Sequence, residues 1–139
     1  MAGTGTVTCA RDGYTVVALR GELDVCTAAD TVRTLTAHAA SGARIIVNLA
    51  ELTFIDCSSL RELVSVRARA QQAGGDLALA DPSPIVLRLL VLTGMISLCP
   101  VFTSTHDAVN GGPAALLAPE TAVSGYLAQR DAGPDAASA

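Results

Sequence analysis

The sequence is short of several residue types on which common functions depend. Among 139 residues it has two histidines, no tryptophan, and only two tyrosines and two phenylalanines. With so few histidines the chain is poor in general bases and metal ligands, which argues against catalysis. Nine Lys and Arg are outnumbered by thirteen Asp and Glu, giving a net charge of -4, and they form no basic run. Because nucleic acid and anionic lipid are bound by basic patches, neither is expected as a partner.

Sequence motifs of the common enzyme classes are also missing. The chain contains neither of the nucleotide-binding loops G-x-x-x-x-G-K-[ST] and G-x-G-x-x-G. No G-x-S-x-G sequence surrounds Ser58, and neither His38 nor His106 stands at a spacing typical of a nucleophile's base. We therefore expect that the protein is not an enzyme and that it holds no cofactor or metal of its own.

The cysteines and the N-terminus indicate a reduced protein without a targeting segment. No C-x-x-C pair occurs among the four cysteines, so neither a zinc site nor a redox dithiol is predicted, and most thiols are expected to be buried; they are Cys9, Cys26, Cys57 and Cys99. The first nine residues lack the regions of a signal peptide, and no stretch approaches the roughly 18 apolar residues of a membrane span. We expect a cytoplasmic protein without a membrane span.

What the sequence does contain indicates a single α/β domain. Half of the residues are hydrophobic, and with so few aromatics the core must consist of Val, Leu, Ile and Ala, as in a buried sheet covered by helices. Alternating strand-like and helix-like runs predict a mixed sheet of four to five strands. The expected strands are 6–10, 14–20, 44–49, 77–80 and 101–102, and the expected helices are 27–41, one from the serines at 58–59 to Gly74, 84–93, and a short one capped by Ser104 or Thr105.

Two boundaries follow from the residues that break this pattern. The strand 44–49 is expected to end in a turn at 50–53, before Phe54 leads into the next helix. From Pro113 onward the composition shifts to Ala, Pro, Gly and Ser, with too few large apolar groups to offset the entropy of ordering. We expect the domain to cover 1–112 and a flexible tail to cover 113–139.

The segment R-I-I-V-N-L-A-E-L-T-F-I-D-C-S-S-L, residues 44–60, resembles the core of the STAS domain, the fold of bacterial anti-sigma factor antagonists. In that family an Asp-Ser-Ser-Gly-Leu motif follows such a strand. Further family motifs are matched by residues 21–24, G-E-L-D, and 74–76, G-G-D. Here Cys57 replaces the first serine of the motif, and Ser59 stands where the family usually has glycine. The resemblance covers about 5–110 and implies a STAS fold over the domain.

The resemblance also implies a function and partners. In family members with the full motif, the second serine is phosphorylated by the anti-sigma factor, an ATP-dependent serine kinase. By position this residue is Ser58, with Ser59 the next choice. The expected function is therefore that of an antagonist that binds a kinase-type anti-sigma factor and is switched off by phosphorylation. ATP belongs to that partner, and a phosphatase is expected to reverse the modification.

The roles of the neighbouring residues stay open at this stage. Asp56 is expected either to align Ser58 for the partner or, like Ser58 itself, to serve only as a helix cap. Cys57 at the helix start would be oxidant-sensitive or simply a small buried thiol. Asp24, in the turn before the first helix, would contact the partner or cap that helix. These residues, with Ser59, form the predicted partner-binding set.

One alternative function and one self-association surface remain. STAS domains also serve as scaffolds and as accessory parts of transport systems, acting through protein contacts without phosphorylation. The helix Ile85 to Leu92 is apolar on nearly every side, interrupted only by Arg88, so one sheet face cannot cover all of it. It is either covered by the tail or forms a protein interface, which predicts a homodimer through this helix.

Overall fold

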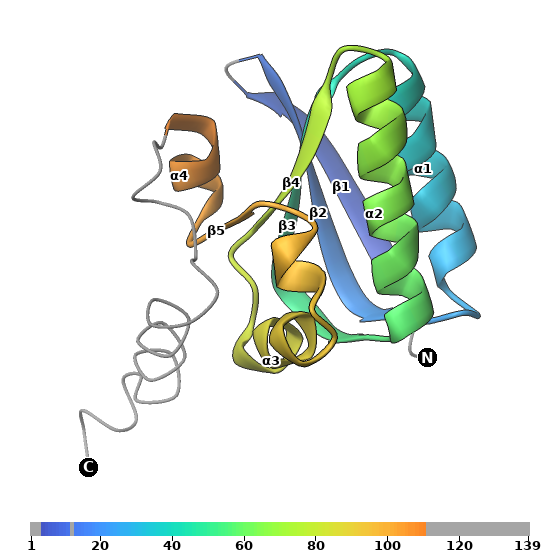
Figure 1. Cartoon of the computed structure of the whole chain (residues 1–139), viewed down its shortest axis with the longest axis vertical. Helices are drawn as coiled ribbons and strands as arrows, with labels where there is room; N and C mark the ends of the chain where they lie inside the picture. Colours follow the sequence, from blue (N-terminus) through green and yellow to red (C-terminus); the bar gives the residue numbers. More distant parts are fainter. Residues whose placement is uncertain (1–3, 12, 111–139) are drawn as a thin grey trace.

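The computed structural model describes residues 4–11 and 13–110 and contains one five-stranded sheet with helices packed on it (Figure 1). Its elements, in chain order, are β1 (Thr4–Arg11), β2 (Tyr14–Leu23), α1 (Ala28–Ala40), β3 (Arg44–Ile55), α2 (Cys57–Gln72), β4 (Asp76–Ala80), α3 (Pro84–Leu92), the 3-10 turn η1 (Met95–Ser97), β5 (Val101–Phe102) and α4 (Thr105–Asn110). The predicted order of elements is confirmed. The predicted tail, 113–139, and the end of the predicted domain at 112 lie outside the described residues.

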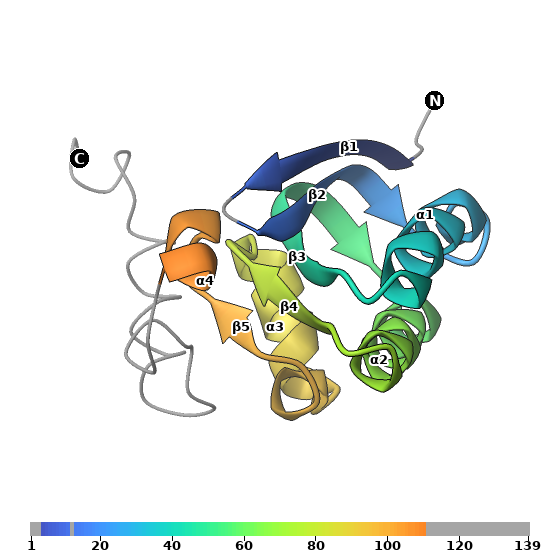
Figure 2. The same cartoon turned by 90° about the horizontal axis from the view of Figure 1, so that it is seen from above.

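The sheet is mixed because its first two strands form a hairpin and the others run parallel. Strands β1 and β2 are antiparallel, whereas β2, β3, β4 and β5 are parallel neighbours in that order. Parallel neighbours need a long crossover, and α1, α2 and α3 supply the three that are required (Figure 2). As a result, the loops that leave β2 and β3 emerge at the same edge of the sheet.

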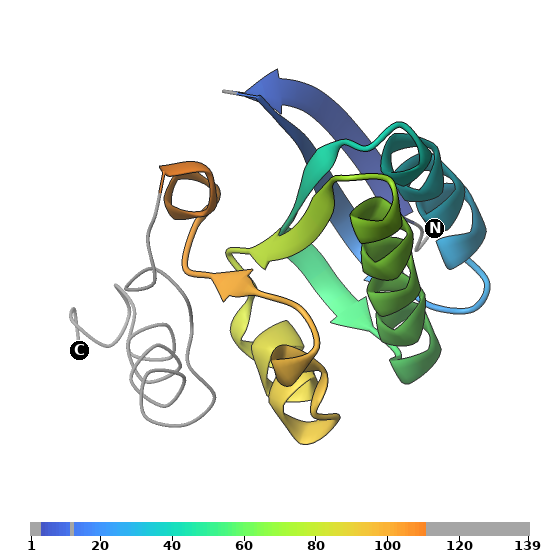
Figure 3. The same cartoon turned by 45° about the horizontal axis from the view of Figure 1, so that its top comes forward.

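The two faces of the sheet are covered unequally. On one face α1 and α2 lie side by side, and Figure 3 shows this pair well separated from α4, which lies on the opposite side. The main core lies under α1, α2 and α3 and is built from aliphatic side chains such as Leu19, Val47 and Leu63. A smaller cluster of Val16, Ile46, Ala80 and Ala108 lies on the other face, under α4.

Strand β3 is longer than the sequence pattern predicted. The expected turn at 50–53 is wrong, because β3 continues to Ile55 and pairs with β2 as far as Leu23. The extension is held by burial of Leu52 and Ile55. Its pairing with β2 shifts register twice, each time with one extra residue on β3, and next to the second shift Gly21 of β2 has a positive φ of 86°. The longer strand delivers Asp56 directly beside the loop that follows β2.

Helix α3 leaves part of its apolar surface exposed, as its composition indicated. Val86, Leu87 and Leu90 enter the core, while Ile85 is exposed and Leu92 keeps 82% of its accessible surface. The predicted homodimer through this helix stays a prediction.

Candidate functional site

The candidate site forms where β2 and β3 end next to each other. The Asp56 amide donates to the Leu23 carbonyl at 3.1 Å, which joins the ends of the two strands. The Val25 amide in turn donates to Asp56 Oδ2 at 3.1 Å. These bonds hold the loop between β2 and α1 against the start of α2, so that residues about thirty positions apart form one surface.

Asp56 is the N-cap of α2. Its backbone is extended, and its Oδ1 atom accepts hydrogen bonds from the Ser59 amide at 2.8 Å and the Ser58 hydroxyl at 3.0 Å. Burial raises the pKa of the Asp56 carboxyl, but hydrogen bonds from the Ser59 amide, the Ser58 hydroxyl and the Val25 amide outweigh this effect and lower the pKa below its ordinary value of 3.8. The carboxylate is therefore charged at neutral pH, and the capping role expected of Asp56 or Ser58 belongs to Asp56.

The two serines have opposite exposure. Ser58 is exposed in the first turn of α2, with its hydroxyl resting on Asp56. Ser59 keeps only 1% of its accessible surface, and its hydroxyl has no hydrogen-bond partner in the part of the chain that the structure describes. Of the two hydroxyls, only that of Ser58 is open to an enzyme from solution.

The cysteines differ from the prediction that most of them are buried. Cys57, the first residue of α2, is exposed, as are Cys9 and Cys26, so the expected small buried thiol at position 57 is wrong. Only Cys99 is buried, and burial raises the pKa of its thiol to about 11. The domain has enough aliphatic core without these side chains, so three of the four thiols remain on its surface.

Asp24 organises the loop between β2 and α1. Its Oδ1 accepts from the amides of Cys26 at 2.9 Å and Thr27 at 3.0 Å, a local arrangement in which a carboxylate closes a turn. Thr27, which stands at the expected cap position, instead donates its hydroxyl to the Glu22 carbonyl at 2.8 Å. The Asp24 carboxylate therefore closes the turn that presents Val25 and does not cap the amides of α1, which begins at Ala28.

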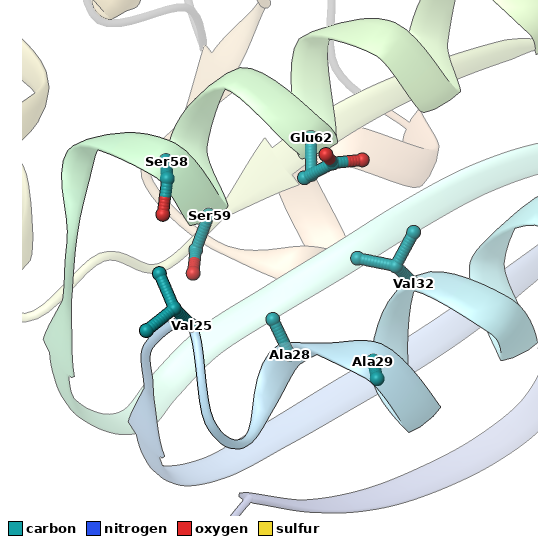
Figure 4. A pocket seen from close by; sticks show the side chains of 7 residues that line it. All are labelled: Val25, Ala28, Ala29, Val32, Ser58, Ser59 and Glu62. Carbon is teal, nitrogen blue, oxygen red and sulfur yellow. The ribbon is translucent and has the colours of Figure 1, made fainter.

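A cleft of about 390 Å³ opens beside Ser58, between the first turns of α1 and α2 (Figure 4). We call it the α1–α2 cleft. Four of the residues that line it are apolar and three are polar: Val25, Ala28, Ala29, Val32, Ser58, Ser59 and Glu62. Of these residues the sequence analysis placed only Ser58 and Ser59 in the site, and it missed the other five, Glu62 among them. Glu62 was detectable in principle, because it lies four residues after Ser58 and therefore on the same side of the helix.

Other site chemistries find no support in the described part of the chain. Within residues 4–11 and 13–110, no group of three or more His, Cys, Asp or Glu side chains is placed to hold a metal ion. Over the same residues, no helix is long and apolar enough to cross a membrane. The arrangement at the site is therefore an exposed hydroxyl held by a carboxylate, next to an apolar hollow.

Most of the described chain matches the model of a known family. The family model described as the STAS domain matches residues 7–108. The chain belongs to the STAS domain family. The STAS fold implied by the resemblance is therefore confirmed.

Similar proteins include regulators of bacterial sigma factors. The chain is 32% identical to the anti-sigma F factor antagonist of Paenibacillus polymyxa over 100 residues, which cover 70% of this chain and 85% of that protein. Its fold is similar to an anti-sigma factor antagonist from Mycobacterium paratuberculosis, with a TM-score of 0.70, 23% identity and coverage of 77% and 92% of the two chains. It is also similar to the Bacillus cell fate determinant SpoIIAA in its phosphorylated form, with a TM-score of 0.58, 20% identity and coverage of 76% and 97%.

Proposed function

We propose that this STAS protein is an anti-sigma factor antagonist that binds a kinase-type anti-sigma factor through the surface around Ser58 and is released when Ser58 is phosphorylated. The observation that carries the proposal is the exposed Ser58 hydroxyl, which rests on Asp56 at the start of α2. It occupies the position at which the motif of the family has its phosphoacceptor. The similarity to a named anti-sigma F factor antagonist supports the class of partner.

The proposed reaction uses the partner's nucleotide. The terminal phosphoryl group of ATP passes to Ser58 Oγ, the hydroxyl proton is lost, and ADP leaves with the partner kinase. Asp56 holds the hydroxyl through the hydrogen bond that it accepts, which makes it a positioning residue in this proposal. The antagonist itself carries out no catalysis, and a phosphatase returns it to the unmodified state. An antagonist with these partners would act in the cytoplasm.

The phosphate is expected to change binding and to leave the fold intact. Amide groups at the N-terminus of α2 favour negative charge, so a phosphate in the first turn does not oppose the helix. It adds about 1.5 to 2 negative charges next to the Asp56 carboxylate. Arg61, exposed three residues later, can offset only part of this charge. A partner that docks on Ser58 would then have to dehydrate a much more polar surface.

Titration calorimetry with purified kinase-type anti-sigma factors from the source organism tests the binding. We expect one of them to bind the unmodified protein without a metal. When ATP and Mg²⁺ are added, it should place a single phosphate on Ser58, as located by peptide mass spectrometry. Failure of every such kinase to bind would instead favour a STAS scaffold that acts without phosphorylation. Modification of Ser59 or of a residue in 113–139 would show that the acceptor was assigned wrongly.

A further inference from the structure

The α1–α2 cleft has the character of a binding surface for an apolar group. Its walls are Val25, Ala28, Ala29 and Val32, and the side chain of Val25 projects into solvent, with 72% of the residue's surface accessible. The backbone of Val25 is fixed by the bond from its amide to Asp56, so this exposure belongs to an ordered loop. When another molecule covers apolar surface that is both fixed and exposed, the free energy falls.

The polar atoms of the cleft restrict what can enter it. None of the lining residues is basic, and Glu62 gives the cleft a negative edge one helical turn from Ser58. The buried Ser59 hydroxyl points toward the space between the two helices and lacks a hydrogen-bond partner among the described residues (Figure 4). The fitting group is therefore an apolar side chain accompanied by a positive charge. Because Ser58 lines the cleft, the protein that docks on Ser58 is its expected occupant.

We propose that the α1–α2 cleft receives an apolar side chain of the anti-sigma factor, and that a Lys or Arg beside that side chain pairs with Glu62. This inference rests on the proposed function, and it adds to Ser58 a second, independent contact for the same partner. It also explains how one phosphate could control the whole interface. Ser58 lines the cleft, so a phosphate there must be dehydrated before an apolar group can be seated. Pairing of that phosphate with an exposed basic side chain contributes far less than this dehydration costs.

Filling the cleft tests the proposal without altering Ser58. Ala29 is exposed on α1 and lines the cleft, and Ala29→Leu replaces it by a residue of good helix propensity. Ala37→Leu is the matched control, since Ala37 is exposed on the same helix and does not line the cleft. The probe is the kinase-type anti-sigma factor that binds the parent protein in the titration above. We expect Ala29→Leu to weaken this complex at least tenfold and Ala37→Leu to bind as the parent does.

Two further variants examine the separate contacts. Val25→Ser removes apolar surface from the loop and should weaken binding, with the melting temperature checked by circular dichroism. Glu62→Gln should weaken binding severalfold and reduce its dependence on salt. If Ala29→Leu binds as the parent does while Ser58→Asp loses affinity, the cleft proposal is wrong and the proposed function stands. Equal losses of affinity for Ala29→Leu and Ala37→Leu would also contradict the proposal that the cleft binds the partner. If no kinase binds the parent, the proposed function fails and the cleft proposal with it.

Discussion

The half-buried Asp56 carboxylate should contribute to the stability of the domain by joining two loops, and Asp56→Ala measures how much. The substitution removes the acceptor for the Ser59 amide at 2.8 Å and for the Val25 amide at 3.1 Å. Loss of an N-cap acceptor costs about 0.5 to 2 kcal/mol, so we expect a loss of roughly 1 to 2 kcal/mol from the free energy of unfolding. For a domain of about 100 residues, each kcal/mol lost lowers Tm by about 4–8 °C.

The assay is urea unfolding followed by far-UV circular dichroism, because the chain has no tryptophan to report by fluorescence. Asp30→Ala is the matched control. Asp30 is also an acidic residue in the first turn of a helix. Among the described residues its side chain makes only an exposed ion pair with Arg33, so we expect a loss below about 0.5 kcal/mol. Asp56→Ala and Asp30→Ala with equal effects would refute the claim that Asp56 joins the two loops.

The pH dependence of the free energy of unfolding provides a second check on Asp56. The pKa of Asp56 is lower in the native state than its ordinary value of 3.8, so the unfolded chain binds this proton first as the pH falls. The stabilisation is thus complete above the unfolded pKa and is lost as the pH falls through the native one. Asp56→Asn keeps a good capping acceptor but cannot titrate. The stability difference between parent and Asp56→Asn should therefore shrink as the pH is lowered from 7 to 3, and a constant difference would contradict the lowered pKa.

Three further predictions follow from the same region and from the thiols. Ser58→Ala leaves the cap in place and should change the free energy of unfolding by less than about 0.5 kcal/mol. Ser58→Asp should weaken binding of the anti-sigma factor at least tenfold, or about 1.4 kcal/mol. If both variants bind as the parent does, Ser58 does not control binding. Ser59→Ala removes a buried hydroxyl without a partner among the described residues and should raise the midpoint of urea unfolding, and a lower midpoint would show that the hydroxyl is bonded. A thiol reagent should modify three cysteines of the native protein rapidly and Cys99 only on unfolding, as counted by intact-mass spectrometry; a fourth rapid modification would contradict its burial.

The sequence was sufficient to predict the order of the elements because each has a local signal. The apolar run from Arg44 to Leu49 predicts a buried strand, and the spacing of Leu60, Leu63 and Val66 predicts one face of a helix. Both were confirmed. The start of α2 near the two serines was predictable for the same reason, since an Asp followed by small polar residues typically begins a helix.

The continuation of β3 past Ala50 depends on its partner strand and has no comparable local signal. Residues Glu51 and Thr53 are exposed, Leu52 and Ile55 are buried, and the alternation is interrupted at Phe54. The interruption coincides with a register shift at which β3 has one extra residue, between its Leu52 and Phe54, while Gly21 and Glu22 of β2 are consecutive. This shift depends on the pairing with β2 and cannot be read from residues 44–55 alone. The α1–α2 cleft escaped prediction for a related reason, because it exists only once the extended β3 has brought the start of α2 beside Val25.

The two carboxylate oxygens of Asp56 accept hydrogen bonds from different segments, which determines how a modification of Ser58 would act. Oδ1 holds the first turn of α2, and Oδ2 holds the loop that presents Val25. A phosphate on Ser58 would remove one donor from Oδ1, because the esterified oxygen has no proton, but it would leave the amide donors of Ser59 and Val25 in place. Both loops would keep their backbone anchors, so the energetic effect would fall on the exposed surface that the partner must dehydrate. The site can therefore gain or lose a phosphate without requiring the domain to unfold.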